Sequence, residues 1–553
     1  MGISDLWYKN AIIYALDVKT FWDSDGDGVG DFAGLTTRLD YLERLGVTCL
    51  WILPFYPSPD RDNGYDITDY YAIDPRLGTL GDFVEFVHEA GGRGIRVLTD
   101  LVVNHTSNQH PWFQASRRDP SSRYRDYYVW SREKPEHPEQ HPVFPGESRG
   151  VWSYDDVAEA YYFHHFYSFE PGLNLANPDV QQEIFRIMGF WLELGISGFR
   201  VDSAPFLVRP KGKALHLHDA GAHTLLERVH RFAQWRRSEA VMLAEANVEP
   251  DKIASYFGDG DEMQMLFNFF GDSHLFLAFA TERAEYIARG LSRVPSPPLD
   301  VGQWVNYLRN LDELDLERLS REEQETVFET FAPEQNMRIF GRGIRRRLAS
   351  MLGGDERRIQ LAFSLIFTLP GTPLFVYGDE IGMGDDLALR GRDAVRTPMQ
   401  WSGEPNGGFS RASASDLVRP VVSSGPFRYE RINVGAQRRP PESLLNRVVG
   451  MIAARKECPE FGWGTYRVLD AGDAAVFAHR CDWSGGTVFA LHNLSARACT
   501  VTVPLDGASD GEVSELMADH RYGPVGRDPF VAELGGYGFR WFRLGDVHRP
   551  AFP

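Results

Sequence analysis

Four acidic residues follow apolar, strand-like segments at positions where they could share one site. They lie in the stretches Asp100-Leu101-Val102-Val103-Asn104-His105, Gly198-Phe199-Arg200-Val201-Asp202, Ala244-Glu245-Ala246-Asn247 and Arg309-Asn310-Leu311-Asp312. Arg200 and Asp202 share a strand face because side chains alternate, and a buried arginine keeps such a carboxylate ionised and able to attack. Crowded carboxylates cannot all ionise, so one should stay protonated near neutral pH. An attacking carboxylate and a protonated acid are what glycoside cleavage requires.

A single acid at a strand end is most often a cap or an ion-pair partner, whereas four at matching ends favour a shared site. Only a closed ring of strands brings them together, because 43 residues separate 202 from 245 and 67 separate 245 from 312. Strand-like and helix-like segments alternate, which predicts an α/β fold, a (β/α)8 TIM barrel with its chemistry at the C-terminal strand ends. The expected strands are 12–16, 49–53, 96–102, 198–201, 241–244, 265–267, 304–308 and 373–377.

The barrel is interrupted and extended in the predicted domain organisation. Residues 1–104 and 179–460 form the catalytic barrel, and the Pro-, Tyr-, Trp- and His-rich residues 105–178 form an excursion domain B over its mouth. Alternating stretches in 461–553 predict a C-terminal antiparallel β-sandwich domain, where a contact between copies would lie if the protein is a homo-oligomer.

Two further segments are interpreted by composition. The insertion 313–350 carries a charged helix (316–331) and the run Arg345-Arg346-Arg347, which favour a solvated face. Residues 402–441 are rich in Gly, Ser, Pro and Arg without a clear period, which favours a functional cover that excludes water from the site.

An acidic loop after the first strand has the spacing of a hard-cation site. Its sequence is Asp23-Ser24-Asp25-Gly26-Asp27-Gly28-Val29-Gly30-Asp31, with Gly28 at the sixth place for the sharp turn. The twelfth place is Gly34 rather than Glu, so the loop lies outside the EF-hand frame. We expect structural Ca²⁺, with Mg²⁺ as the alternative ion and a solvated acidic turn as the alternative interpretation. The expected ligands are Asp23, Asp25, Asp27, Val29 and Asp31.

Composition limits the class of partner and the location. The net charge of −19 over 553 residues argues against nucleic acid and anionic membrane surfaces. The start, Met1-Gly2-Ile3-Ser4-Asp5, lacks the basic and apolar parts of a secretory signal, and no run of about 18 apolar residues predicts a membrane span. Four scattered cysteines suit a reduced cytoplasm as packing residues. We therefore expect a cytoplasmic protein that acts on small molecules.

These blocks resemble the signature regions of the α-amylase superfamily of retaining glycoside hydrolases and transglycosylases, over almost the whole chain. The resemblance implies that Asp202 is the nucleophile, Glu245 the general acid/base and Asp312 the third acid, which holds sugar hydroxyls. The stretch Asp62-Asn63-Gly64-Tyr65 resembles the block around the cleaved glucose, where Asp62 binds hydroxyls and Tyr65 stacks on the ring. The resemblance also implies substrate contacts from His105 and Arg200.

Within the superfamily, several stretches resemble the trehalose synthases, which interconvert maltose and trehalose. They are Trp7-Tyr8-Lys9-Asn10-Ala11, the acidic loop, 377–385, Arg396-Thr397-Pro398-Met399-Gln400-Trp401, 406–410 and 436–439. The block at Arg396, which would face the acceptor side, is shared with α-glucosidases. Two positions depart from the pattern. Leu311 replaces a histidine, and Gly172 replaces an aspartate that supports a second calcium site, so the resemblance implies only the first.

Three functions follow from this resemblance. The first is retaining transglucosylation between maltose and trehalose through a covalent glucosyl-enzyme, with hydrolysis as a side reaction. The second is an α-glucosidase or transglucosidase acting on small α-glucosides, which forms no trehalose from maltose. The third is an inactive carbohydrate-binding homologue; such relatives lack the acid pair, whereas Asp202 and Glu245 are both present here.

Overall fold

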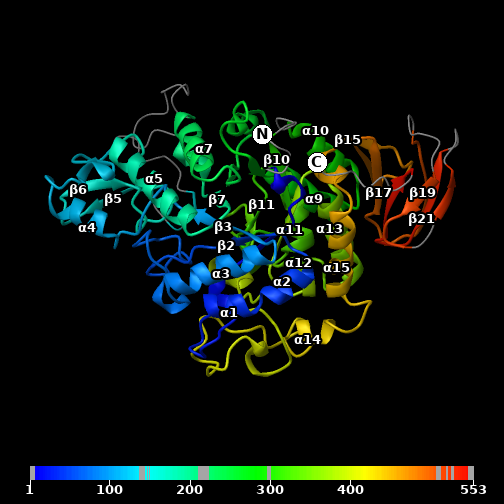
Figure 1. The fold of residues 1–553 in the computed structure, drawn as a ribbon, viewed down its shortest axis with the longest axis horizontal. Helices are drawn as coiled ribbons and strands as arrows, with labels where there is room; N and C mark the ends of the chain where they lie inside the picture. The colour runs from blue at the N-terminus through cyan, green and yellow to red at the C-terminus, as the bar shows by residue number, and fades with distance from the viewer. Residues whose placement is uncertain are drawn as a thin grey trace.

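Eight parallel strands close into a barrel at the centre of the protein in this computed structural model (Figure 1). Around the ring the order is β1, β2, β3, β7, β8, β9, β10 and β14. The strands span Ile13–Leu16, Cys49–Ile52, Arg96–Leu101, Gly198–Val201, Val241–Ala244, Met265–Phe267, Gln303–Tyr307 and Thr372–Val376. The predicted (β/α)8 barrel is confirmed, with every strand bound within one residue of its expected place.

The barrel forms because its strands are rich in apolar residues and helices cover the ring. All residues of β1, β2, β7 and β8 are buried, as in parallel sheets that are covered on both faces. Helix α3 begins with a capping box in which Thr79 and Asp82 satisfy each other's backbone amides. The other covering helices include α1 (Phe32–Thr37), α2 (Leu39–Leu45), α5 (Pro178–Glu193), α7 (Thr224–Arg236), α9 (Phe269–Thr281), α10 (Glu285–Arg293) and α13 (Glu356–Thr368), besides α3 (Leu80–Gly92).

Two insertions leave the barrel between its strands. The first, after β3, contains α4 (Pro111–Arg118) and a three-stranded sheet of β4 (Trp130–Ser131), β6 (Ala160–Phe163) and β5 (Trp152–Asp155), and it projects to one side in Figure 1. The second, after β10, contains α11 (Arg321–Phe331) and a small sheet of β11 (Leu314–Asp315), β13 (Gly343–Ile344) and β12 (Arg338–Ile339).

The expectation that the arginine run in the second insertion is a solvated face is wrong for its last member. Arg347 is 1% exposed; its Nη1 donates to the main-chain oxygen of Tyr377 at 2.7 Å and to Oδ1 of Asp379 at 3.2 Å. Arg346 pairs with Asp385 at 3.2 Å. Charge runs are usually solvated, but here two guanidiniums bind groups that follow β14.

Residues 402–441 pack beneath the barrel, next to the acidic loop, with α14 (Val434–Gln437) among them (Figure 1). The main-chain nitrogen of Val418 donates to the oxygen of Gly28 at 2.9 Å, and that of Asp23 donates to the oxygen of Phe409 at 3.1 Å. Gly28 allows this approach, since a Cβ there would lie 2.2 Å from the main-chain oxygen of Asp416. The segment therefore covers the acidic loop.

The C-terminal part forms two antiparallel sheets on the side opposite the first insertion (Figure 1). It follows α15 (Leu444–Lys456) and α16 (Glu460–Trp463). One sheet contains β15 (Thr465–Leu469), β16 (Val476–Trp483), β17 (Gly486–Asn493), β22 (Phe539–Leu544), β19 (Glu512–Glu515) and β20 (Arg521–Pro524). The other pairs β18 (Cys499–Val503) with β21 (Phe530–Leu534). The expected antiparallel β-domain is confirmed.

The structure describes residues 6–135, 143–145, 147, 150–208, 223–295, 301–505, 512–518, 521–524 and 529–545. The N-terminal residues 1–5, on which the expectation about a secretory signal depends, lie outside these ranges. None of the described helices combines the length and apolar character that a membrane crossing needs.

Candidate active site

Arg200 lies among the acids that the sequence predicted to meet. Its strand β7 pairs with β3 and β8, which places it beside Asp100. Nη1 of Arg200 donates to Oδ1 of Asp100 and to Oδ1 of Asp202, each at 2.6 Å, and Nη2 contacts Oε2 of Glu245. One buried guanidinium therefore holds carboxyl groups from three neighbouring strand ends.

The surroundings of Glu245 raise its pKa, so that a substantial fraction of this group is protonated near neutral pH. Burial raises the pKa of Glu245 to about 7; Arg200 and Arg392 oppose the rise, and Asp202 and Asp312 add to it. A protonated acid beside a carboxylate that an arginine holds can divide the roles of proton donor and nucleophile.

Two arginines hold Asp312, which lies in the chain that follows β10 (Gln303–Tyr307). Arg396 donates from Nη2 to Oδ1 of Asp312 at 2.7 Å and from Nε to the main-chain oxygen of Leu311 at 2.9 Å. Nη1 of Arg392 lies 3.2 Å from the same oxygen of Asp312. Burial alone would raise the pKa of Asp312, but Arg392, Arg396 and Arg200 together lower it. An ionised carboxylate here can accept hydrogen bonds from sugar hydroxyls.

Asp62, Tyr65 and His105 lie in the wall of the same pocket. Burial raises the pKa of Asp62 to about 6, against the effect of Arg392 and Arg396. Tyr65 is buried and lies with its ring centre 5.9 Å from the guanidinium carbon of Arg200. The structure thus brings the substrate contacts implied by the resemblance to the predicted acids.

The pocket has a volume of about 540 Å³, which suits a small molecule. Its lining contains Asp202, Glu245 and Asp312. Segment 402–441 contributes no lining residue among those that the structure describes, so the expectation that this segment covers the site is wrong. Residues 143–145 of the first insertion and 313–342 of the second supply lining residues instead.

Contacts between the two insertions close one side of the pocket. Arg342 donates from Nη1 to the main-chain oxygen of Val143 and from Nε to Oδ2 of Asp315, each at 3.0 Å. The rings of Phe144 and Phe340 stack with their centres 4.6 Å apart. These contacts join the two insertions at one wall of the pocket.

Leu311 does not occupy a place in the pocket lining. It is 1% exposed and packs in the main hydrophobic core, with a left-handed backbone of φ 72° that is rare for a bulky residue. The main-chain oxygen of Leu311 accepts the bond from Arg396. The side chain at position 311 therefore packs in the core and does not line the pocket.

Arg392 is a pocket residue that sequence reasoning missed. Besides Asp312 it binds Oε2 of Glu313 at 2.8 Å, and its guanidinium lies 4.9 Å from the ring centre of Phe144. It precedes Arg396 by four residues, just before the block that carries the resemblance. The available signal was a second arginine so close to that block.

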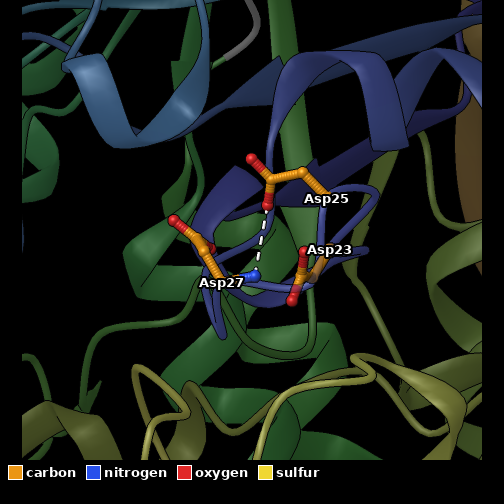
Figure 2. Close-up of side chains that lie close together, drawn as sticks. All are labelled: Asp23, Asp25 and Asp27. Carbon is orange, nitrogen blue, oxygen red and sulfur yellow. Dashed lines mark hydrogen bonds between the residues drawn. The ribbon is translucent and has the colours of Figure 1, made fainter.

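The acidic loop brings Asp23, Asp25 and Asp27 together, with one carboxylate oxygen of each within 4.8 Å of the others (Figure 2). Burial raises the pKa of Asp25, and the neighbouring carboxylates add to the rise, so a cation there would offset mutual repulsion. Asp31 is not in this group: it caps α1, accepting from the nitrogen of Gly34 at 2.6 Å and from Ser24. The main-chain nitrogen of Val29 donates to Asp27. The oxygen donors fit a hard cation.

Gly172, which stands where the related sequences have an aspartate that supports a second calcium site, offers no carboxylate. It forms a β-bridge with His105, and the nitrogen of Leu173 donates to the main-chain oxygen of Asn104 at 2.9 Å.

Comparison with protein families supports the barrel and the C-terminal sheets separately. The description "Alpha amylase, catalytic domain" matches residues 15–464, and "Sucrose hydrolase-like, C-terminal domain" matches residues 485–543.

Curated relatives and solved structures agree with the two family matches. The chain is 41% identical to "Trehalose synthase/amylase TreS" of Mycobacterium tuberculosis, covering 97% of this chain and 90% of that protein. It is 39% identical to "Trehalose synthase" of Pimelobacter sp., covering 99% and 97%. Among solved structures, trehalulose synthase MutB from Pseudomonas mesoacidophila superposes with a TM-score of 0.76 at 26% identity, covering 97% of this chain and 99% of that one.

Proposed function

Because the chain belongs to the alpha-amylase family, we propose that it is a trehalose synthase-like enzyme that interconverts maltose and trehalose with retention of configuration. Hydrolysis of maltose is its side reaction. The observation that carries the proposal is the bridging of Asp202 and Glu245 by the guanidinium of Arg200, in a chain 41% identical to a trehalose synthase/amylase over nearly its full length.

In the first half-reaction, Asp202 attacks the anomeric carbon of maltose and forms a glucosyl ester. The bond to the leaving oxygen breaks as Glu245 gives its proton to that oxygen, which frees glucose. The raised pKa of Glu245, about 7, leaves a substantial fraction of this group protonated near neutral pH, which supports this role. Arg200 keeps the attacking carboxylate in place through its 2.6 Å contact.

In the second half-reaction, the released glucose turns within the pocket and presents its anomeric hydroxyl. Glu245 takes the proton from this hydroxyl, whose oxygen attacks the glucosyl ester, and Asp202 leaves as a carboxylate. Two inversions give the α,α-1,1 link with net retention. Water in place of glucose gives hydrolysis, so exclusion of water sets the ratio of the two products.

The remaining pocket residues bind the glucosyl unit. Asp312, held by Arg396, accepts bonds from its hydroxyls, and Asp62 and His105 bind others. Tyr65 stacks on the ring. These roles are supported by the shared pocket and by the lowered pKa of Asp312.

A second candidate is an α-glucosidase that mainly hydrolyses small α-glucosides. It is favoured by Leu311, which cannot donate to a hydroxyl, and by 30% identity to the "Oligo-1,6-glucosidase" of Heyndrickxia coagulans. Maltose given to the purified protein, with sugars separated by chromatography, distinguishes the two. We expect trehalose with a smaller amount of glucose; glucose without trehalose would reject the isomerase.

The acidic loop is proposed to hold a structural Ca²⁺, with Mg²⁺ as the alternative. Asp23, Asp25 and Asp27 would bind it through carboxylate oxygens. Bound Ca²⁺ would neutralise the repelling carboxylates. The hydroxyl of Ser410 donates to Asp23 and joins the loop to segment 402–441, which supports a role in stability rather than in chemistry.

A further inference from the structure

Glu170 presents a buried carboxyl group behind the wall of the pocket. It lies in the loop between β6 and α5, its exposed fraction is 0%, and it is not among the residues that line the cavity. This loop pairs with the chain after β3: the nitrogen of Thr106 donates to the oxygen of Pro171 at 3.2 Å, and that of Asn108 donates to the oxygen of Phe169 at 2.7 Å. The main chain on both sides of Glu170 is therefore fixed.

The surroundings of this carboxyl group are acidic. Asp62 lies within hydrogen-bonding reach of it, and Asp66 is near. Nε2 of His105 is 3.8 Å from Oε1, beyond a hydrogen bond. Among the described residues Oε1 has no hydrogen-bond partner, and Oε2 accepts a long bond of 3.4 Å from the nitrogen of Tyr167. A buried carboxylate with so few donors would be strongly destabilising.

One proton shared with Asp62 resolves this problem. Two carboxyl groups in contact cannot both ionise. Arg392 and Arg396 act on Asp62 and favour its charged form, whereas burial, Asp62 and Asp66 all raise the pKa of Glu170 well above its ordinary value. The proton therefore resides on Glu170.

We propose that Glu170 is a positioning residue whose protonated carboxyl group donates a hydrogen bond to Asp62, leaving the other oxygen of Asp62 to bind the hydroxyls of the glucosyl unit. The role rests on the proposed function, because it assumes that a glucosyl unit binds where Asp62 lines the pocket. The other charged or titratable groups around the pair are Asp66, His105, Tyr167, Asp312, Arg392 and Arg396.

Three variants test this role: Glu170→Gln, which keeps a donor, Glu170→Leu, which removes it, and Glu193→Gln, an exposed control at the end of α5. Steady-state kinetics use an activated aryl α-glucoside as well as maltose. We expect E170Q and E193Q to keep KM within about threefold of the wild type, and E170L to raise KM about ten- to a hundredfold, as for the loss of one bond to a charged group. The value of kcat should change less.

The pH dependence provides a test even if E170L does not fold. Because the folded state raises the pKa of Glu170, its proton is lost as pH rises. The wild-type KM should therefore increase as pH rises through the raised pKa of Glu170, and the KM of E170Q should stay flatter over the same range, since glutamine does not titrate.

Several results would overturn the role. If E170Q were as damaging as E170L, an ionised Glu170 paired with His105 would explain the site instead. Folded E170L with an unchanged KM would mean that Glu170 only fills space in the packing. If KM depended on pH in the same way in E170Q and in the wild type, the proton on Glu170 would have no part in substrate binding. Failure of the proposed function is separate: maltose would then yield no trehalose, while the aryl glucoside still reports the KM of each variant.

Discussion

Arg200 donates from Nη1 to Oδ1 of Asp202 at 2.6 Å, between side chains two residues apart on and just after β7. Its other terminal nitrogen contacts Glu245 from the next strand. The planar fork of arginine can hold two carboxyl groups at once, whereas the single ammonium of lysine cannot reproduce that geometry.

We therefore expect Arg200→Lys to reduce kcat/KM for maltose by about a hundredfold or more, equivalent to about 2.7 kcal/mol of transition-state stabilisation. The matched control is Arg357→Lys, because Arg357 pairs with Asp355 at the exposed start of α13. Kinetics of both variants, with their circular dichroism spectra, provide the measurement. A folded R200K with wild-type kcat/KM would show that the bridge is dispensable.

The pH profile should report the proton on Glu245. The first half-reaction needs this group protonated, and its pKa is about 7, so kcat/KM for maltose should fall as pH rises through about that value. With α-glucosyl fluoride, whose leaving group needs no proton, the alkaline fall in the glucosylation step should be weaker. An identical fall in kcat/KM for both substrates would mean that a group other than Glu245 causes the loss of activity at alkaline pH.

Leu311→His should not restore a catalytic donor. The side chain packs in the core on a left-handed backbone and does not line the pocket, so a histidine there would be buried among apolar groups. We expect a loss of about 1–3 kcal/mol in unfolding free energy and no gain in kcat. Urea unfolding and maltose kinetics measure both quantities; a tenfold rise in kcat would mean that the side chain reaches the sugar.

Arg342→Ala should shift the products from trehalose toward glucose. Arg342 joins Val143 to Asp315 across the two insertions, and its loss should admit water to the glucosyl-enzyme. Arg338→Ala is the control from four residues earlier, since the side chain of Arg338 donates to Ala332 and Glu325 instead. The measurement is the ratio of glucose to trehalose formed from maltose. Equal ratios in the two variants would exclude this contact as a barrier to water.

Removal of the cation should lower stability. A ligand present at one hundred times its dissociation constant adds about 2.7 kcal/mol to the free energy of unfolding. Chelation of Ca²⁺ should therefore lower Tm, and added Ca²⁺ should restore it. In Asp25→Asn with Asp27→Asn, chelation should have little effect, because two of the three clustered carboxylates are gone. Calorimetric scans with and without chelator decide this. A wild-type Tm that does not change with chelator would contradict a stabilising Ca²⁺ in this loop.

The sequence was sufficient to predict the barrel because each strand is a short, mainly apolar run and helical patterns lie between the strands; β8, Val-Met-Leu-Ala, shows this most clearly. The acids at strand ends could be predicted for the same reason. Contacts between distant segments could not. Nothing local indicates that 402–441 packs on the acidic loop, or that Arg347 is buried against Tyr377.

The environments of individual side chains could not be predicted from the sequence either. Leu311 could be recognised as a departure, but its φ of 72° depends on the surrounding fold. Glu170 stands two residues before Gly172, and only the pairing of 169–173 with 104–108 places its carboxyl group beside Asp62. These features arise from tertiary packing, which the periodicity of apolar residues in the sequence does not reveal.

The most direct measurement is mass spectrometry of the protein after incubation with a fluorinated α-glucosyl fluoride, which slows hydrolysis of a covalent glucosyl-enzyme. We expect one sugar adduct per chain, on the peptide that contains Asp202, and a parallel loss of trehalose formation from maltose. Full inactivation with the adduct on a different acid, or persistent turnover without any adduct on that peptide, would contradict the mechanism.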